Sequence, residues 1–284
     1  MFKSIGKIIK WIGEHFKGML FLLIVVFLFM PNSSKMTDNA NLQEIELTGP
    51  IMNADKVLEQ IESAQKNKNI KGVLLNVNSP GGSVPPSIEI SYAIRELQKH
   101  KPVIAYASGI MASGSYYSSI YASKIIANPG AIVGSIGVIM QSADLSEIMN
   151  TLGVKTQIVK QGKFKEAGTK TRQWTKDERE ELETLTKDAY ELFIKDVADA
   201  RGLDVNNAKK YADAHIFSAK RAKEAGLIDQ IAVKSEVKKI LIKDANVTKA
   251  VWKEKDKVDS FIEKIKGESL IKVQNYFYGL QATL

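Results

Sequence analysis

Short apolar segments alternate with amphipathic segments from Leu42 onward, and this alternation constrains the fold more than any other feature of the sequence. Apolar runs of about four to eight residues favour buried strands, and apolar residues three or four apart favour helices. Repeated βα units of this length are typical of a mostly parallel sheet with helices on both faces. The sequence therefore predicts an α/β fold, with strands at 45–51, 72–78, 103–107 and 124–127 and helices at 53–66, 85–100 and 111–122.

The second part of the chain is expected to be more helical. Thr175 and Glu178 have the spacing of a capping box, in which each side chain bonds the other residue's backbone N–H. We expect a long helix from there to about Ala200, ended by Gly202, because glycine tolerates the left-handed conformation that closes a helix. Asn53 is expected to cap the helix at 53–66. Two shorter helices are expected at about 206–214 and 218–225.

The N-terminus reads as a membrane segment. Met19–Met30 is an uninterrupted apolar run of 12 residues, preceded by lysines and followed by Pro31. At about 1.5 Å per residue this run covers roughly 18 Å of a hydrocarbon core about 30 Å thick. Apolar residues before it, between lysines whose stems can snorkel, lengthen the usable span. The sequence therefore predicts an N-terminal transmembrane helix that acts as a signal anchor.

A cleaved signal peptide is the alternative to this anchor. Cleavage requires small residues of the Ala-x-Ala kind after the apolar run, and Phe29-Met-Pro-Asn-Ser33 has no such pattern. Lysines on the N-terminal side keep that end in the cytoplasm. We therefore expect a single-pass protein of the cytoplasmic (inner) membrane, with the remaining chain on its outer, periplasmic side.

Composition excludes several classes of function. The net charge of +8 could suggest a nucleic-acid partner, but about half of it lies in residues 1–35, so we expect no nucleic acid. Without cysteine there is no disulfide framework and no thiolate site. The sequence shows no cluster of His, Asp and Glu with ligand-like spacing, so we expect no metal and no cofactor.

Three parts are expected along the chain. Residues 1–35 form a cytoplasmic stub and the membrane anchor, residues 36–235 the main domain, with its βα part to about residue 160, and residues 236–284 a C-terminal extension. The last 30 residues mix charges with apolar side chains. They fit either an amphipathic helix, for a partner subunit or the membrane surface, or a frayed tail with one packed face.

Two glycine- and serine-rich turns could carry chemistry. Asn78-Ser-Pro-Gly-Gly-Ser83 lies between a predicted strand and helix, where an open α/β sheet places its ligands. Its glycines leave N–H groups free for a phosphate or a developing oxyanion, or the turn is purely structural. In Ala107-Ser-Gly-Ile-Met-Ala-Ser-Gly-Ser-Tyr-Tyr-Ser118, a serine at the turn is a candidate nucleophile, although Ser108 and Ser113 also suit helix caps.

A serine nucleophile needs a base, and the histidines offer poor candidates. His15 lies in the membrane-proximal segment, His100 at the end of a surface-like helix, and His215 between helices of the second part. A lysine can act as base where burial or nearby positive charge keeps it neutral. The segment 159–168 offers three lysines, and it is also compatible with a charged surface loop. Spacing alone does not choose among Lys160, Lys163 and Lys165.

Four motifs, in order and at family-like separations, resemble one protease family. They are Asn78-Ser-Pro-Gly-Gly82, Met111-Ala-Ser-Gly-Ser-Tyr-Tyr117, Ala127-Asn-Pro-Gly-Ala-Ile-Val-Gly-Ser-Ile-Gly-Val138 and Gln161-Gly-Lys-Phe-Lys165. Over residues 40–235 the chain resembles signal peptide peptidase A in its short bacterial form, a membrane-anchored serine protease with a Ser-Lys dyad. The resemblance implies the Clp-protease/crotonase fold.

The resemblance also implies roles for individual residues. It makes Ser113 the nucleophile, Lys165 the general base, Ser135 the residue that orients this lysine, and Gly82 and Gly114 the oxyanion-hole donors. The family motif reads Ala-Ser-Gly-Gly-Tyr, and here a serine replaces its second glycine. This departure predicts a changed substrate pocket, in which Ser115 and Tyr116 contact the substrate.

The function implied is an endopeptidase that degrades signal peptide remnants and other hydrophobic peptides at the membrane. The resemblance further implies a homo-oligomer in which the lysine serves the serine of a neighbouring protomer. Three alternatives stay open from the sequence. One is a related Ser-Lys protease that cleaves membrane-associated proteins, and another is a crotonase-type acyl-CoA enzyme that uses the same glycine N–H pair. The third is a non-catalytic membrane scaffold.

Overall fold

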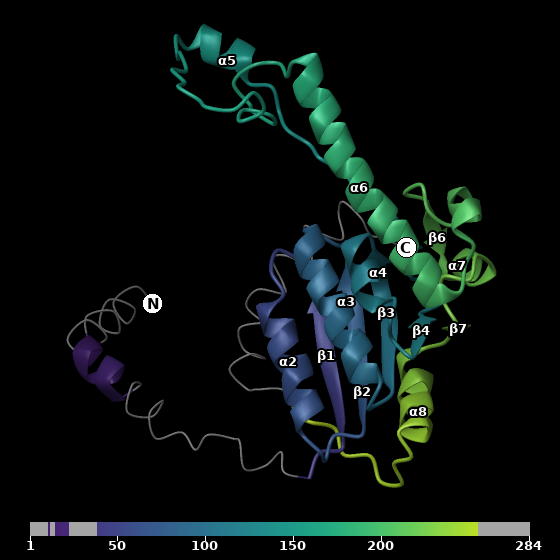
Figure 1. Cartoon of the computed structure of the whole chain (residues 1–284). Coiled ribbons are helices and arrows are strands. Elements are labelled where there is room, and N and C mark those ends of the chain that lie inside the picture. The colour runs from purple at the N-terminus through teal and green to yellow at the C-terminus, as the bar shows by residue number, and fades with distance from the viewer. Residues whose placement is uncertain (1–10, 12–14, 23–38, 255–284) are drawn as a thin grey trace, which may run out of the picture. The chain divides into compact units, whose positions relative to one another are not determined.

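A computed structural model describes residues 11, 15–22 and 39–254 of the chain. Residues 15–22 are helical and belong to a unit, Met1–Asn39, separate from the one that contains the sheet. The strands and their order in the sheet define the second unit (Figure 1). Its strands are β1 (Leu42–Thr48), β2 (Gly72–Ser79), β3 (Val103–Ala112), β4 (Lys124–Ala127), β5 (Ile132–Gly134), β6 (Ile216–Ser218) and β7 (Gln230–Ile231).

These strands form one sheet that is almost entirely parallel. The main path runs β1-β2-β3-β4-β7, and β5 continues beside the far end of β3, where it also pairs with β6. Among the strand pairs, only β5 with β6 is antiparallel within the described chain. Because parallel strands need crossover connections, helices lie between them. They are α2 (Asp55–Lys66), α3 (Val84–Gln98), α4 (Gly114–Ser119), α5 (Ser146–Thr151), α6 (Lys176–Arg201), the 3₁₀ helix η2 (Val205–Lys210), α7 (Ala219–Glu224) and α8 (Lys234–Asp244).

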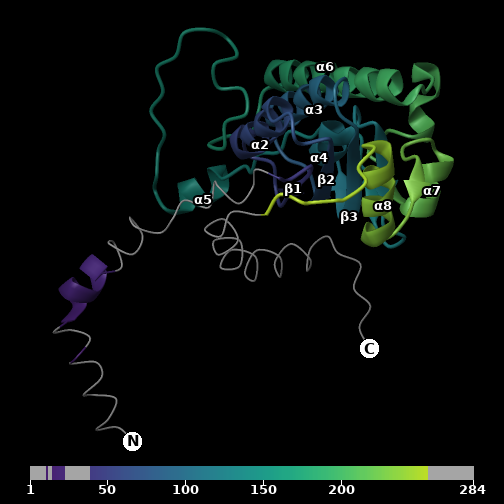
Figure 2. The same cartoon turned by 90° about the horizontal axis from the view of Figure 1, so that it is seen from below.

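Helices cover both faces of the sheet. Alternate residues of the strands point to opposite faces: Val73 and Leu75 belong to the large core beneath α2, α3, α4 and α6, whereas Leu74 belongs to a smaller core beneath α8. Figures 1 and 2 show α8 apart from α2 and α3, on the other side of the strands. Trp252 packs against the smaller core, and the backbone of Lys253 donates to the carbonyl of Leu42. The predicted mostly parallel α/β sheet is confirmed.

Most predicted elements are present, with shifted bounds. Helix α6 has both hydrogen bonds of the Thr175–Glu178 capping box and ends at Gly202, whose φ of 63° is left-handed, as predicted. Asn53 is not a cap, because Ala54 occupies that position without a side-chain bond. The helix expected at 111–122 begins only at Gly114, since residues up to Ala112 continue β3 beside β5. The short strands β5, β6 and β7 and helices α5 and α8 had no separate sequence prediction.

The predicted membrane segment falls largely outside the described residues, as does the C-terminal stretch 255–284. Among the helices described, none combines the length and the apolar character needed to cross a bilayer. The expectation of an anchor at residues 1–35 therefore stays a prediction.

Candidate active site

Ser113 occupies a strained turn between β3 and α4. Its φ of 53° and ψ of −126° lie in a region that residues with a Cβ rarely adopt. The surrounding hydrogen bonds hold this conformation: the Ser113 N–H donates to the carbonyl of Gly134 at 2.8 Å, and its own carbonyl accepts from Tyr117 N–H at 3.0 Å. Ser113 is partly exposed, whereas the residues on either side of it are buried. A strained, accessible serine at a strand-to-helix turn is typical of an activated nucleophile.

Gly82 and Gly114 place two backbone N–H groups beside this serine. Gly114 is the first residue of α4, so its N–H has no carbonyl partner within the helix. Gly82 pairs with Ile51 through the carbonyl of Gly81 and the N–H of Ser83, which leaves its own N–H directed to the opposite side. A Cβ on Gly114 would lie 3.2 Å from Gly82 N, so the two loops are in close contact. Converging N–H groups of this kind can hold an oxyanion.

Ser135 lies next to Ser113 at the end of the neighbouring strand. Ala112 and Gly134 are register partners in β3 and β5, so the two serines follow paired residues. Ser135 also has a positive φ, 51°, and its N–H donates to the carbonyl of His215 at 2.7 Å. The structure therefore brings Ser113, Ser135, Gly82 and Gly114 to one edge of the sheet.

Ser115 and Tyr116 are both fully buried. The Tyr116 hydroxyl donates to the carbonyl of Leu227 at 2.8 Å, and the Ser115 hydroxyl is bonded to the backbone of Ser79 and Ala112. In this conformation neither residue exposes surface that a substrate could contact. The predicted contact of Ser115 and Tyr116 with substrate stays a prediction.

Lys165 lies in an exposed arm, which we define as residues 139–192: α5, the lysine-containing loop and the first part of α6. Lys160 pairs with Glu166 at 2.6 Å and Lys163 with Asp177 at 2.5 Å, whereas no ion pair involves Lys165 in the described part of the chain. Apart from Glu178 and Leu182, every residue of the arm is at least partly exposed. The arm packs against little of its own chain.

Helix α6 separates the arm's loop from the serine. At one end, Asp196 accepts a hydrogen bond of 2.6 Å from Tyr117, four residues beyond Ser113. At the other end, Arg172 bridges Glu178 and Glu166, the neighbour of Lys165. The roughly 18 residues from Glu178 to Asp196 span about 27 Å. Figure 1 likewise shows α5 at the end of α6 remote from α4, so one chain does not bring Lys165 to its own Ser113.

Charged groups fix the start of α6. Hydrogen bonds from Arg172 and from the backbone N–H of Thr175 lower the pKa of Glu178 to about 2. The pKa of Glu166 is also lowered, chiefly by its hydrogen bond with Lys160 and further by Arg172. These carboxylates stay ionised at neutral pH and tie the loop to the helix.

Two supporting residues had no role in the sequence analysis. Ile51 holds the Gly82 loop by backbone pairing, and a Cβ on Gly82 would lie 2.2 Å from the Ile51 carbonyl oxygen. Asn78 accepts a hydrogen bond of 3.0 Å from the N–H of Ile110 and so fixes β3 before the turn. The motif containing Asn78 drew attention to it, but no sequence signal marks Ile51.

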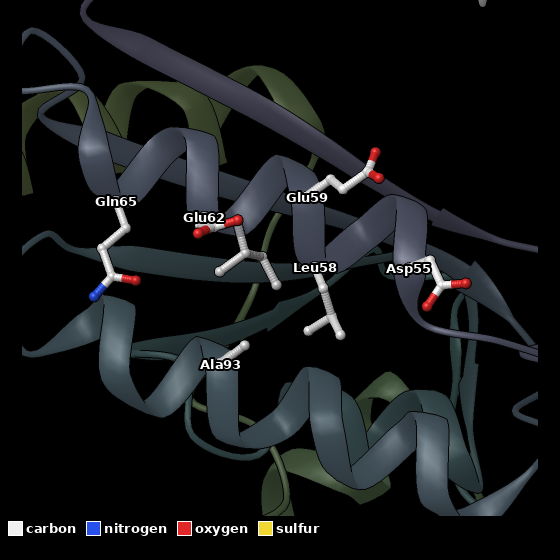
Figure 3. A pocket seen from close by; sticks show the side chains of 7 residues that line it. Asp55, Leu58, Glu59, Glu62, Gln65 and Ala93 are labelled. Carbon is white, nitrogen blue, oxygen red and sulfur yellow. The ribbon is translucent and has the colours of Figure 1, made fainter.

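A separate shallow groove of about 430 Å³ lies between α2 and α3 (Figure 3). Leu58, Ile61 and Ala93 form its apolar part, and three carboxylates rim it. It contains none of the predicted site residues. No group of three His, Cys, Asp or Glu side chains suited to a metal ion is present among the residues that the structure describes.

Comparisons with known proteins agree with this fold. The model of peptidase family S49 matches residues 95–248, more than half of the chain, and the Clp protease model matches residues 34–128. A putative protease of Methanocaldococcus jannaschii is 40% identical over 188 residues, 66% of this chain and 60% of that protein. The chain thus spans less than two thirds of that relative.

Two further likenesses extend the comparison. A putative signal peptide peptidase SppA of Enterococcus faecium is 33% identical over 233 residues, which cover 81% of this chain and 67% of that protein. A solved mutant of the 1510-N membrane-bound stomatin-specific protease superposes with a TM-score of 0.50 at 15% identity, covering 71% of this chain and 84% of that one. At this identity the likeness concerns the fold alone.

The α/β fold and the family models together define the class of protein: the chain contains a peptidase-family domain with a Clp-protease type of fold. It belongs to peptidase family S49, whose members similar to this chain include proteases of the SppA type. The resemblance seen in the sequence is confirmed at this level, and it favours proteolysis over the acyl-CoA alternative.

Proposed function

We propose that the chain is a membrane-anchored endopeptidase with Ser113 as nucleophile and Lys165 as general base. The observation that carries the nucleophile is the conformation of Ser113: a strained, partly exposed serine held beside the N–H groups of Gly82 and Gly114. Backbone strain persists only where the surroundings over-determine it, and it gathers at functional sites. No other serine on that edge except Ser135 has a positive φ within the described chain.

The reaction would follow the order of acyl transfer. Neutral Lys165 takes the proton of Ser113 Oγ as this oxygen attacks the scissile carbonyl carbon. The N–H groups of Gly82 and Gly114 stabilise the oxyanion of the tetrahedral intermediate. The charged lysine then gives its proton to the leaving amine, and water hydrolyses the acyl-enzyme. Ser135, beside Ser113, is suited to accept or donate a hydrogen bond that orients the lysine.

We propose that the lysine comes from a second copy of the chain. Helix α6 holds the loop of Lys165 about 27 Å along its axis from the serine end. Exposed apolar side chains occur along the arm, among them Ile139 (82% exposed), Leu152 (72%) and Val159 (100%). Burying them against a second chain would be favourable. We therefore propose a homo-oligomer in which each arm reaches the Ser113 of a neighbour and buries Lys165 there.

Burial in such an interface would also keep the base uncharged. A lysine accepts a proton only when neutral, and desolvation disfavours its charged form. In a single chain Lys165 is exposed. Assembly would thus supply both the position of the base and its protonation state.

The proposed location and substrate follow from the N-terminal sequence. An anchor in residues 1–35 would hold a protease domain of residues 36–235, with its extension 236–284, at the outer face of the cytoplasmic membrane. Hydrophobic peptides left in that membrane, signal peptide remnants above all, are the substrates proposed. The similarity to a putative signal peptide peptidase supports this choice.

The test compares wild type, Ser113→Ala and Lys165→Ala as detergent-solubilised full-length proteins, with a fluorogenic peptide that has small or apolar residues before the scissile bond. Lys155→Ala, an exposed lysine of the same arm, is the matched control. We expect both site variants to lose cleavage and the control to keep it. Cleavage by Ser113→Ala would refute the nucleophile, and cleavage by Lys165→Ala would move the base to Lys160, Lys163 or a histidine.

A further inference from the structure

We infer that Ser115 is a positioning residue whose hydroxyl fixes the spacing of the two oxyanion-hole loops; the inference rests on the proposed role of Gly82 and Gly114. Ser115 is the second residue of α4 and is fully buried. Its Oγ accepts the N–H of Ala112 at 2.9 Å and lies 2.6 Å from the carbonyl oxygen of Ser79 and 2.9 Å from that of Ala112. A hydroxyl has one proton, and the shorter contact directs it to Ser79.

This hydroxyl bridges the ends of two neighbouring strands. Strands β2 and β3 pair in parallel, their register shifts between Val77 and Ser79, and they pair once more at Ser79 and Met111. At this last pair, Ser115 Oγ accepts from Ala112 N–H and donates to Ser79 C=O, so it contacts the backbone of both strand ends. The serine side chain therefore reinforces the pairing of the two strands at the point where they end.

Each bridged residue stands just before an oxyanion donor. Ser79 leads through Pro80 and Gly81 to Gly82, and Ala112 leads through Ser113 to Gly114. The two loops are in close contact, since a Cβ on Gly81 would lie 2.6 Å from Gly114 N. Oxyanion hydrogen bonds act over a narrow range of about 2.7–3.1 Å. A change in the spacing of the strand ends would therefore move one donor relative to the other.

Ser119 supplies a matched control. It is as deeply buried as Ser115 and lies on the same helix, and its hydroxyl donates to the carbonyl of Ser115 at 2.8 Å, within the helix. That bond joins no second loop. Removing it tests the loss of a buried serine hydroxyl from α4 without separating the strand ends.

The experiment uses full-length Ser115→Ala, Ser115→Gly and Ser119→Ala. Alanine leaves Ala112 N–H and Ser79 C=O without the bridge and fills the space with a methyl group. Glycine, the residue of the family motif, opens space in which a water can replace the hydroxyl. We expect kcat to fall about 10- to 100-fold in Ser115→Ala, a fraction of the loss caused by deleting one donor, and less in Ser115→Gly. KM should stay within about twofold of wild type.

A second readout separates positioning from general stability. A peptide aldehyde that forms a hemiacetal with Ser113 places its oxygen in the oxyanion hole, and we expect its affinity to fall in parallel with kcat. Ser119→Ala should keep both values even if its melting temperature falls. If Ser115→Ala keeps wild-type kcat, raises KM alone, or matches Ser119→Ala in every readout, the inference is wrong. The proposed function fails separately, by cleavage in Ser113→Ala.

Discussion

Gly82 tolerates no side chain, because the backbone of Ile51 occupies the place of its Cβ at 2.2 Å from the carbonyl oxygen. Backbone atoms cannot rotate away from a new Cβ as a side chain can, so in Gly82→Ala the paired segments at Gly82 and Ile51 must shift apart. We expect this shift to displace the Gly82 N–H from its place in the oxyanion hole. We expect kcat to fall about 100- to 1,000-fold, the usual loss for one oxyanion donor. Steady-state cleavage measures it.

Gly130→Ala is the matched control for this change. A Cβ there meets nothing nearer than 3.6 Å, an ordinary contact, so activity and melting temperature should remain at wild-type values. Equal activity of Gly82→Ala and Gly130→Ala would contradict the role of the Gly82 loop.

Tyr117 and Asp196 form the buried polar contact between α4 and α6. The hydroxyl of Tyr117 donates to Asp196 at 2.6 Å, and Tyr92 reaches the same oxygen at 3.4 Å. Burial, followed by the bond to Asp196, raises the pKa of Tyr117, so the phenol stays protonated and remains the donor.

Tyr117→Phe should therefore lower the free energy of unfolding by about 1–3 kcal/mol, because it leaves a buried carboxylate short of a donor. Denaturant titration measures the loss. In the double variant Tyr117→Phe/Asp196→Asn the losses should not add, since both changes affect one hydrogen bond. Additive losses would show that the contact contributes little.

At this scale, sequence reasoning reached the residues that lie in short motifs and missed those that act across the chain. Ser113, Gly82 and Gly114 lie in glycine-rich turns that the residues alone mark as candidates, whereas their roles, and Ser135 itself, came from the family resemblance. The partners Ile51 and Asp196 lie in ordinary segments and acquire their roles only through tertiary contacts.

Helix α6 begins at an ionic cluster, and its start should depend on pH. The pKa of Glu178 is about 2 in the folded chain, below its ordinary value of 4.5. A lowered pKa means that the stabilisation by Glu178 is complete above about pH 4.5 and is lost as the pH falls towards 2. We expect Glu178→Gln to be less stable than wild type at pH 6, and the gap to narrow on acidification.

Thermal unfolding of wild type and Glu178→Gln between pH 6 and pH 2.5 measures this gap. Glu180→Gln, an exposed change two residues further along α6, should stay within about 0.5 kcal/mol of wild type throughout. If the difference in stability between wild type and Glu178→Gln does not change with pH, the ionised Glu178 carboxylate does not stabilise the start of α6, and the prediction is wrong.

Elements with local signals were predicted best. The capping box and Gly202 set α6, and short, mostly apolar segments set β2 and β4. The start of α4 was misplaced because residues 111–112 suit either state, and pairing with β5 decides for a strand. Strands as short as β5, β6 and β7 are too short to show a periodicity in the sequence. They form only where a neighbouring strand supplies backbone hydrogen-bond partners.

At the scale of the whole molecule, complementation tests whether the site is shared between chains. Ser113→Ala and Lys165→Ala, each inactive alone, are mixed under conditions that exchange subunits. If serine and lysine come from different copies, about a quarter of the sites in a random equal mixture are intact. We expect activity near that fraction of wild type.

A subunit-exchange control uses two preparations of the same variant, which should remain inactive after mixing. Absence of activity in the mixed sample, with exchange demonstrated by labelled chains, would refute a shared site and require each arm to fold back onto its own serine.

In the proposed oligomer, the separation of Lys165 from Ser113 along α6 would give a lone copy the properties of a zymogen. Such a copy would carry a nucleophile without its base, so a newly made or diluted chain would be latent and harmless to its surroundings. Crowding in a membrane would then do what removal of a pro-segment does in other proteases. Proteolysis would switch on steeply with the local density of copies, and it would switch off again when they disperse.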